Sequence, residues 1–189
     1  MNDNVKLALY RFRYAIILLA VVLGLTLATP KFFSSNNFLN ILWAVSIVGI
    51  ISMGATFVIL VGRIDLSMGQ TAALSGITAA LLIKGGTPIP AAIAAACCVG
   101  AAVGVVNGLL VIQFHVPEFI TTLATGSIIT GIAQMISRGK TISIMESKAY
   151  IFLGSGKIAD IPIPIFCFLF SFLIAFFILN YMVLGRKCY

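Results

Sequence analysis

Six long apolar runs constrain the fold of this 189-residue chain more than any other feature. They cover residues 14–29, 41–61, 66–83, 91–114, 119–136 and 162–184. Each is close to the roughly 20 apolar residues that a helix needs to cross a bilayer. Lipid offers open backbone groups no hydrogen-bond partner, so a spanning run must be a helix or a strand of a closed barrel. Barrel strands would be about 10 residues long with alternating polarity. The runs therefore predict an all-α, polytopic membrane helix bundle with about six transmembrane helices.

Composition supports lipid as the solvent for most of the surface. The chain is 61% hydrophobic and 9% charged, whereas a soluble domain carries roughly 25% charged residues. The net charge is +7, but the basic residues stand singly or in twos between the apolar runs. Nucleic-acid binding needs a continuous basic face, so we expect no nucleic-acid partner and assign these cations to the lipid headgroups.

The runs and their flanks suggest three parts. Residues 1–13 are expected to form a cytoplasmic amino-terminal tail, 14–184 the transmembrane domain, and 185–189 the start of a further cytoplasmic segment. The first run could be a signal peptide, but an uncleaved helix is the better prediction because five more runs follow. Residues 137–161 form a polar stretch with a turn at 154–156.

Orientation rests on the first helix. With the amino terminus inside, six cations fall on each side of the membrane, so a plain count does not decide. The flank of the first helix usually dominates, and it carries Lys6, Arg11 and Arg13 against Lys31. Both termini are therefore predicted to be cytoplasmic.

Residues 61–69 place Arg63 and Asp65 between two apolar runs with almost no loop. Charges near hydrocarbon are costly. In a structural interpretation, Asp65 is the N-cap of the third helix and accepts N–H groups near Ser67 and Met68, while Gly62 ends the second helix. In a functional interpretation, the segment is a broken helix that lines a translocation path. The two roles are compatible.

Polar side chains inside the runs are the other candidates for a substrate path. Most Ser and Thr hydroxyls can bond the carbonyl four residues earlier in their own helix, but an Asn or a Gln must face another helix or water. Thr121 and Thr125 would form a hydroxyl stripe on one helix face. The predicted substrate-path residues are Asp65, Ser67, Asn107, Thr121, Thr125 and Gln134.

The fourth run has a small residue at every fourth position. The series is Ala92, Ala96, Gly100, Gly104 and Gly108. Such a ridge lets two membrane helices approach closely. We expect helix packing within the chain at Gly100, Gly104 and Gly108, with homodimerisation through the same face as the alternative.

Signatures of catalysis are lacking in the sequence. The strings at 139–141 and 154–157 imitate the end of a phosphate-binding loop, but neither completes the Gly-x-x-x-x-Gly-Lys-Ser/Thr pattern. The four cysteines have no metal-ligand spacing with the single His115. We expect no catalytic residues, no metal, no cofactor and no enzymatic activity.

Several strings resemble the permease subunits of ribose-type ABC importers. The most specific is Ile-Asp-Leu-Ser at 64–67, within a Gly-x-Ile-Asp-Leu-Ser-x-Gly pattern at 62–69. Arg63 stands where a second Gly is usual in the family, and Met68 where Val is usual. Further similar strings lie, in the family's order, at 40–42, 54–60, 107–110, 117–123, 138–143, 161–164 and 185–189.

The resemblance implies an inner-membrane permease that moves a ribose-like monosaccharide. It implies as partners a second permease chain, two ATPase subunits and a periplasmic or lipid-anchored sugar-binding protein. Family members continue beyond the Gly-Arg string into an ATPase-docking segment, so the chain is expected to be a fragment or a truncated product. The alternatives are a branched-chain amino-acid ABC permease, an integral membrane enzyme, or a self-contained channel or carrier. Embedded hydroxyls and amides favour a sugar over a charged amino acid.

Overall fold

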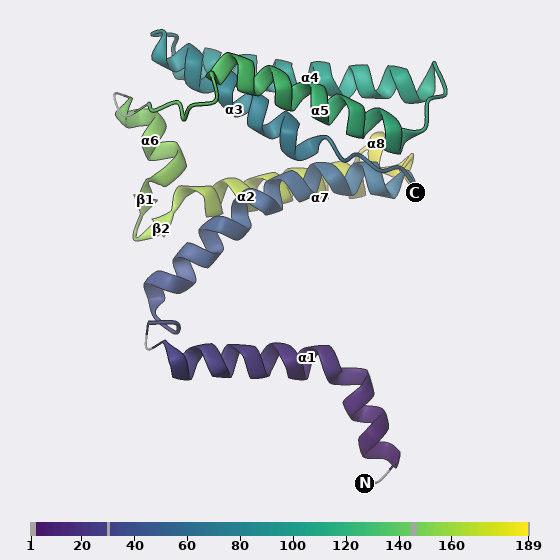
Figure 1. Ribbon diagram of the computed structural model, residues 1–189, viewed down its shortest axis with the longest axis vertical. Helices are drawn as coiled ribbons and strands as arrows, with labels where there is room; N and C mark the ends of the chain where they lie inside the picture. Colours follow the sequence, from purple (N-terminus) through teal and green to yellow (C-terminus); the bar gives the residue numbers. More distant parts are fainter. Residues whose placement is uncertain (1–2, 30, 145–146, 189) are drawn as a thin grey trace. The chain divides into compact units, whose positions relative to one another are not determined.

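The computed structural model describes residues 3–29, 31–144 and 147–188, and most of them are helical (Figure 1). The elements, in chain order, are α1 (Asp3–Ala28), α2 (Ser35–Leu60), α3 (Met68–Lys84), α4 (Ile89–Ile112), α5 (Glu118–Ser137), α6 (Lys148–Ser155), β1 (Lys157–Ile158), β2 (Ile161–Pro162), α7 (Ile163–Tyr181) and α8 (Val183–Arg186).

Five helices in the described residues are long and apolar enough to span a membrane. They are α1 from Arg11 onward, α2, α4, α5 and α7. The sixth expected span, α3, has 17 residues, the lower end of the spanning range of about 17–25. The prediction of an all-α, multi-pass membrane protein is confirmed. Helices α1 and α2 begin well before their apolar runs, since α1 takes in residues 3–13 and α2 starts at Ser35.

The chain divides into two compact units, Met1–Ala44 and Val45–Tyr189. In the first unit, Ser34 forms the N-cap of α2, because its hydroxyl accepts the Asn37 N–H at 3.2 Å. The Asn37 side chain donates in turn to the Phe32 carbonyl at 2.8 Å. These bonds close the turn between α1 and α2.

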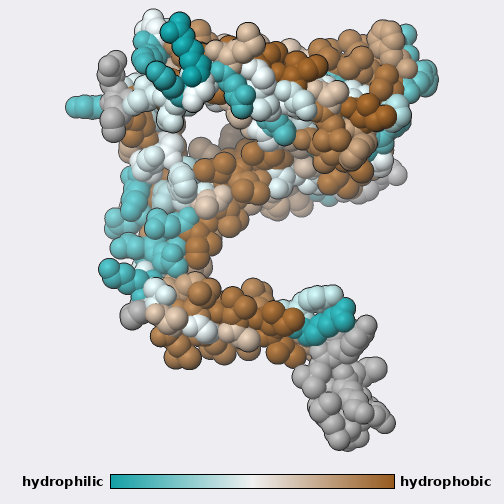
Figure 2. Space-filling model, in the orientation of Figure 1, coloured by the Kyte–Doolittle hydropathy of each residue, from teal (hydrophilic) through white to brown (hydrophobic). Residues whose placement is uncertain are grey.

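In the second unit α3, α4 and α5 pack side by side (Figure 1). Their core is formed by Leu74 of α3 with Ile129 and Ala133 of α5, and Val99 and Val103 of α4 pack against it. Outside this core, large apolar side chains cover the helices, as the brown surface in Figure 2 shows. Such a surface suits contact with lipid or with other membrane helices.

The polar stretch at 137–161 has more structure than its composition predicted. It contains α6 and a two-stranded antiparallel hairpin in which Lys157 pairs with Pro162 and Ile158 with Ile161. The two turn residues, Ala159 and Asp160, have φ values of 49° and 66°, as a type I′ turn requires. Ala is unusual there, which is why the sequence does not predict the turn. The expected turn at 154–156 is not formed, since α6 continues to Ser155 and Gly156 is extended and leads into β1.

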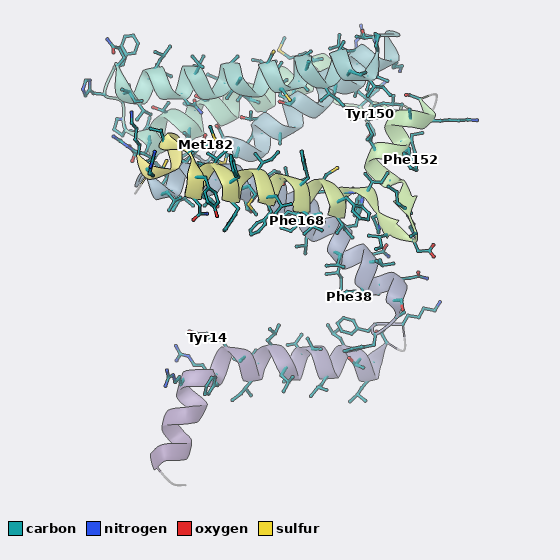
Figure 3. The ribbon with its side chains drawn as sticks, turned by 180° about the vertical axis from the view of Figure 1, so that it is seen from behind. Tyr14, Phe38, Tyr150, Phe152, Phe168 and Met182 are labelled. Atoms are coloured by element: carbon teal, nitrogen blue, oxygen red, sulfur yellow. The ribbon has the colours of Figure 1, made fainter. Side chains whose placement is uncertain are left out.

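Helix α7 is rich in phenylalanine and ends at Tyr181, three residues before its apolar run does. Met182 breaks the helix with an extended backbone before α8. The ring of Phe168, labelled in Figure 3, lies so close to Gly49 of α2 that no methyl group fits between them.

Candidate functional site

The site begins where α2 stops. Gly62 has φ +72°, its N–H donates to the Ile59 carbonyl at 2.9 Å, and the Arg63 N–H donates to the Val58 carbonyl at 3.1 Å. This pair of bonds is a Schellman motif, which favours glycine because the central residue is left-handed. The prediction that Gly62 ends the second helix is confirmed.

Residues 63–67 form a non-helical segment that runs alongside α5. At one end, Arg63 contacts Glu118, the first residue of α5, with 3.1 Å between nitrogen and oxygen. At the other end, a methyl group on Gly126 would lie 3.6 Å from the Cα of Ser67. Glu118 and Gly126 are eight residues apart on α5, which corresponds to a rise of about 12 Å. The non-helical segment therefore lies beside the first turns of α5 before α3 begins.

Asp65 lies within this segment and holds its end in place. One carboxylate oxygen, Oδ1, accepts hydrogen bonds from both the N–H and the hydroxyl of Ser67, each at 2.7 Å. The N-cap position of α3 is occupied by Ser67 itself, so the prediction of Asp65 as the N-cap is wrong by two residues. The part of the prediction in which the carboxylate accepts the Ser67 N–H is confirmed, and this bond forms before the helix starts because the chain is still non-helical at Asp65.

Asn107 of α4 joins the same group of side chains. Its Nδ2 donates to the Ser67 hydroxyl at 2.9 Å, and the Ser67 and Asn107 residues are 1% and 6% exposed. The hydroxyl of Ser67 therefore donates to Asp65 and accepts from Asn107. Three of the predicted substrate-path residues thus form one connected group, the Asp65–Ser67–Asn107 network.

The carbonyl groups of the broken segment are bonded from α3. In the amide orientation that satisfies its neighbours, Gln70 donates to the Leu66 carbonyl at 3.1 Å and to the Ser67 carbonyl at 3.3 Å. The Thr71 hydroxyl adds a bond to the Ser67 carbonyl at 2.8 Å. Gln70 was not among the predicted site residues, although Ser67-x-x-Gln70 has the capping-box spacing that marks a helix start.

The remaining predicted residues have different environments. Thr121 is 3% exposed, and its hydroxyl oxygen and Asn107 Oδ1 are buried with no hydrogen-bond partner among the described residues. The Thr125 hydroxyl donates to the Thr121 carbonyl at 2.8 Å, the ordinary bond of a threonine within its own helix. Gln134 is exposed and lies on the groove between α3 and α5. Within the described part of the chain, neither Thr125 nor Gln134 is bonded to the network.

Asp65 also lines a cavity of about 310 Å³ between α2, α3 and α4. Thr71, Ser75, Gly100 and Gly104 share its wall. Asp65 is therefore accessible on one side while its Oδ1 is bonded on the other. Arg63, two residues before this carboxylate, forms its salt bridge with Glu118 and not with Asp65.

The small-residue ridge of α4 faces α3 over only part of its length. Ala92 is fully buried, and a methyl group on Gly100 would lie 3.5 Å from the Ser75 hydroxyl oxygen. Methyl groups on Gly104 and Gly108 would have no described atom outside their own helix turn within 4 Å. Close packing inside the chain is therefore possible at Gly100, while the other two glycines face open space.

Known proteins match nearly the whole chain. Residues 37–189 match the family model described as "Branched-chain amino acid transport system / permease component". The chain is 37% identical to the ribose import permease protein RbsC of Haemophilus influenzae over 177 residues, which cover 92% of this chain and 54% of the relative. No solved structure matches.

Two further relatives are named for other sugars. The D-allose transport system permease protein AlsC of Escherichia coli is 35% identical over 91% of this chain and 53% of the relative. The L-arabinose ABC transporter permease protein AraH of Azospirillum brasilense is 32% identical over 93% and 52%. The chain thus spans about half the length of the curated relatives it matches. With its apolar spanning helices and a match over residues 37–189, the chain belongs to this family of transport-system permease components.

Proposed function

We propose that this chain is part of the membrane-spanning permease of a bacterial inner-membrane ABC importer that takes up a monosaccharide. The observation that carries the proposal is the similarity to permeases named for ribose, allose and arabinose over more than nine-tenths of the chain. The broken segment 63–67 supports it, because irregular backbone at membrane depth is tolerated where it is covered by protein or lines a path.

The substrate path is proposed to use the predicted residues in two groups. Asp65, Ser67 and Asn107 shape the break between α2 and α3, and Asp65 faces the adjoining cavity. Thr121, Thr125 and Gln134 lie on α5, whose first half covers the broken segment. Of the three ridge glycines, Gly100 is proposed to set the spacing of α4 from α3, whereas Gly104 borders the cavity beside Asp65 and Gly108 faces open space.

The energy for transport and the delivery of the sugar to the permease are proposed to come from other subunits. The partners are a second permease chain, two ATPase subunits and a periplasmic or lipid-anchored sugar-binding protein, with membrane lipid around the helices. The chain itself is proposed to have no enzymatic activity, and both termini are proposed to be cytoplasmic. In this orientation the hairpin β1–β2 faces outward.

Sugar uptake tests the function directly. Cells lacking the gene are expected to lose high-affinity uptake of labelled ribose, allose or arabinose and to regain it with the intact gene. Branched-chain amino-acid uptake is the second candidate, since the family's description names that class. If labelled leucine uptake depends on the gene and uptake of none of the three sugars does, the sugar proposal is wrong.

A further inference from the structure

A groove of about 300 Å³ runs between α3 and α5, apart from the cavity beside Asp65. Its polar lining consists of Gln70, Thr130, Gln134 and Ser137, and small residues such as Gly69 and Ala73 leave room between them. The volume lies at the small end of ordinary small-molecule pockets. None of the described residues that line it is charged, and apart from small and apolar side chains its only polar groups are amides and hydroxyls.

The two hydroxyl groups of the groove already use their hydrogens within α5. Thr130 donates to the Gly126 carbonyl at 2.8 Å, and Ser137 donates to the Gln134 carbonyl at 3.3 Å. Each oxygen keeps a lone pair that can accept a further bond. A donor for a solute must therefore come from an amide side chain.

Gln70 is held in one orientation by the broken segment. Both of its N–H groups are used on the carbonyls of Leu66 and Ser67, so its carbonyl oxygen remains as an acceptor. A side chain that is already fixed loses little conformational entropy when it binds a solute. Gln70 thus offers a preoriented acceptor at the level of Gly126, where its Cδ would lie 3.4 Å from a methyl group.

Gln134 lies on α5 about two helical turns after Gly126, and its side chain is exposed. Among the described residues, no hydrogen bond to its carboxamide is formed. An amide that faces an apolar solvent without a partner is unfavourable, so this side chain must meet water, a solute or another chain. It can both donate and accept, as a solute with neighbouring hydroxyl groups requires.

We propose that the α3–α5 groove binds a hydroxylated solute during its passage, with Gln70 and Gln134 as two successive amide positions about 12 Å apart along the helix axis. This inference rests on the proposed function. The uncharged lining favours a neutral sugar over a zwitterionic amino acid, whose two charges would find no partner there.

The test uses the native importer in cells, with the four cysteines of this chain replaced by serine or alanine. Gln134→Cys is labelled with a small thiol reagent with and without ribose. Met135→Cys is the matched control, since Met135 is the next residue on α5, is 80% exposed and does not line the groove. Ribose is expected to slow labelling of Gln134→Cys but not of Met135→Cys, and leucine to slow neither. Uptake by Gln134→Leu should show a KM raised about tenfold, the effect of losing roughly one net hydrogen bond, with partial recovery in Gln134→Asn.

Two results would overturn the inference while leaving the proposed function intact. One is normal sugar uptake by Gln134→Leu together with labelling that ribose does not slow. The other is efficient thiol cross-linking of the Gln134→Cys variant to a second copy of itself whether or not ribose is present, which would make the groove a contact between chains. If the gene supports no sugar uptake at all, the proposed function fails first and the groove proposal with it.

Discussion

Asn107 donates a hydrogen bond from its side-chain nitrogen to the hydroxyl of Ser67 across 2.9 Å, although the two residues are 40 positions apart in the sequence. The same hydroxyl donates to Asp65. Helix α4 thereby holds the first turn of α3, and α3 is fixed where the chain leaves its irregular segment. The network positions the break between α2 and α3 from a neighbouring helix rather than from local sequence alone.

Ser67→Ala should destabilise the folded protein. It leaves Asn107 Nδ2 buried without its acceptor, and a buried polar group left unpaired costs about 1–3 kcal/mol. Unfolding of the purified protein in mixed micelles measures the change. Ser127→Ala is the control, because that hydroxyl is exposed and donates to the Leu123 carbonyl of its own helix. Equal stability of the two variants would mean that the network contributes nothing to the fold.

Asp65→Asn should keep more than half of wild-type uptake in the native importer, while Asp65→Ala should lose clearly more at equal abundance in the membrane. The two bonds to Ser67 both end on a single oxygen, Oδ1, and an Asn side chain offers an acceptor in the same place. Ala offers none. If Asn and Ala are equally inactive, the negative charge itself is needed, and it acts through the cavity that Asp65 lines.

All the long helices are predictable from the sequence because lipid permits few alternatives to an apolar helix. The break at Gly62 is predictable as well, since a left-handed residue favours glycine. The cap lies two residues later than predicted, because capping patterns do not reveal how far a non-helical segment continues before a helix starts. Two tertiary contacts, Arg63 with Glu118 and Asn107 with Ser67, were not predicted, since neither leaves a pattern along the chain.

Arg63 and Glu118 should behave as an ion pair that fixes the start of the broken segment against α5. Their nitrogen and oxygen are 3.1 Å apart, and the side chains are 53% and 29% exposed. Arg63→Glu alone should lower transport by placing two carboxylates together, and Glu118→Arg in the same chain should restore much of it. The single variant's defect should shrink at high salt, which screens exposed charges. Failure of the double variant to recover would indicate that Arg63 acts independently of Glu118.

Cysteine labelling should place the hairpin and the α4–α5 turn on opposite sides of the membrane. In a cysteine-free background of intact cells, Lys157→Cys is expected to react with an impermeant reagent, and Gln113→Cys to react only after permeabilisation. Both positions are exposed, so burial does not explain a difference. The reverse pattern would invert the proposed orientation, and the flank of the first helix would then not decide the topology.

Gly100→Leu should disturb the α3–α4 contact far more than Gly104→Leu. A methyl group at Gly100 would sit in ordinary contact with Ser75 and Thr71 of α3, at 3.5 and 3.9 Å, so Ala is tolerated there but a longer side chain must push α3 away. Gly104 has open space beside it and borders the cavity next to Asp65. Its leucine variant should fold normally and affect uptake instead, by filling that cavity. Stability in detergent and uptake in cells, measured for both variants, separate these effects. If Gly104→Leu is the less stable of the two, the second half of the ridge packs against another chain, and the small residues of α4 serve assembly rather than the fold of a single chain.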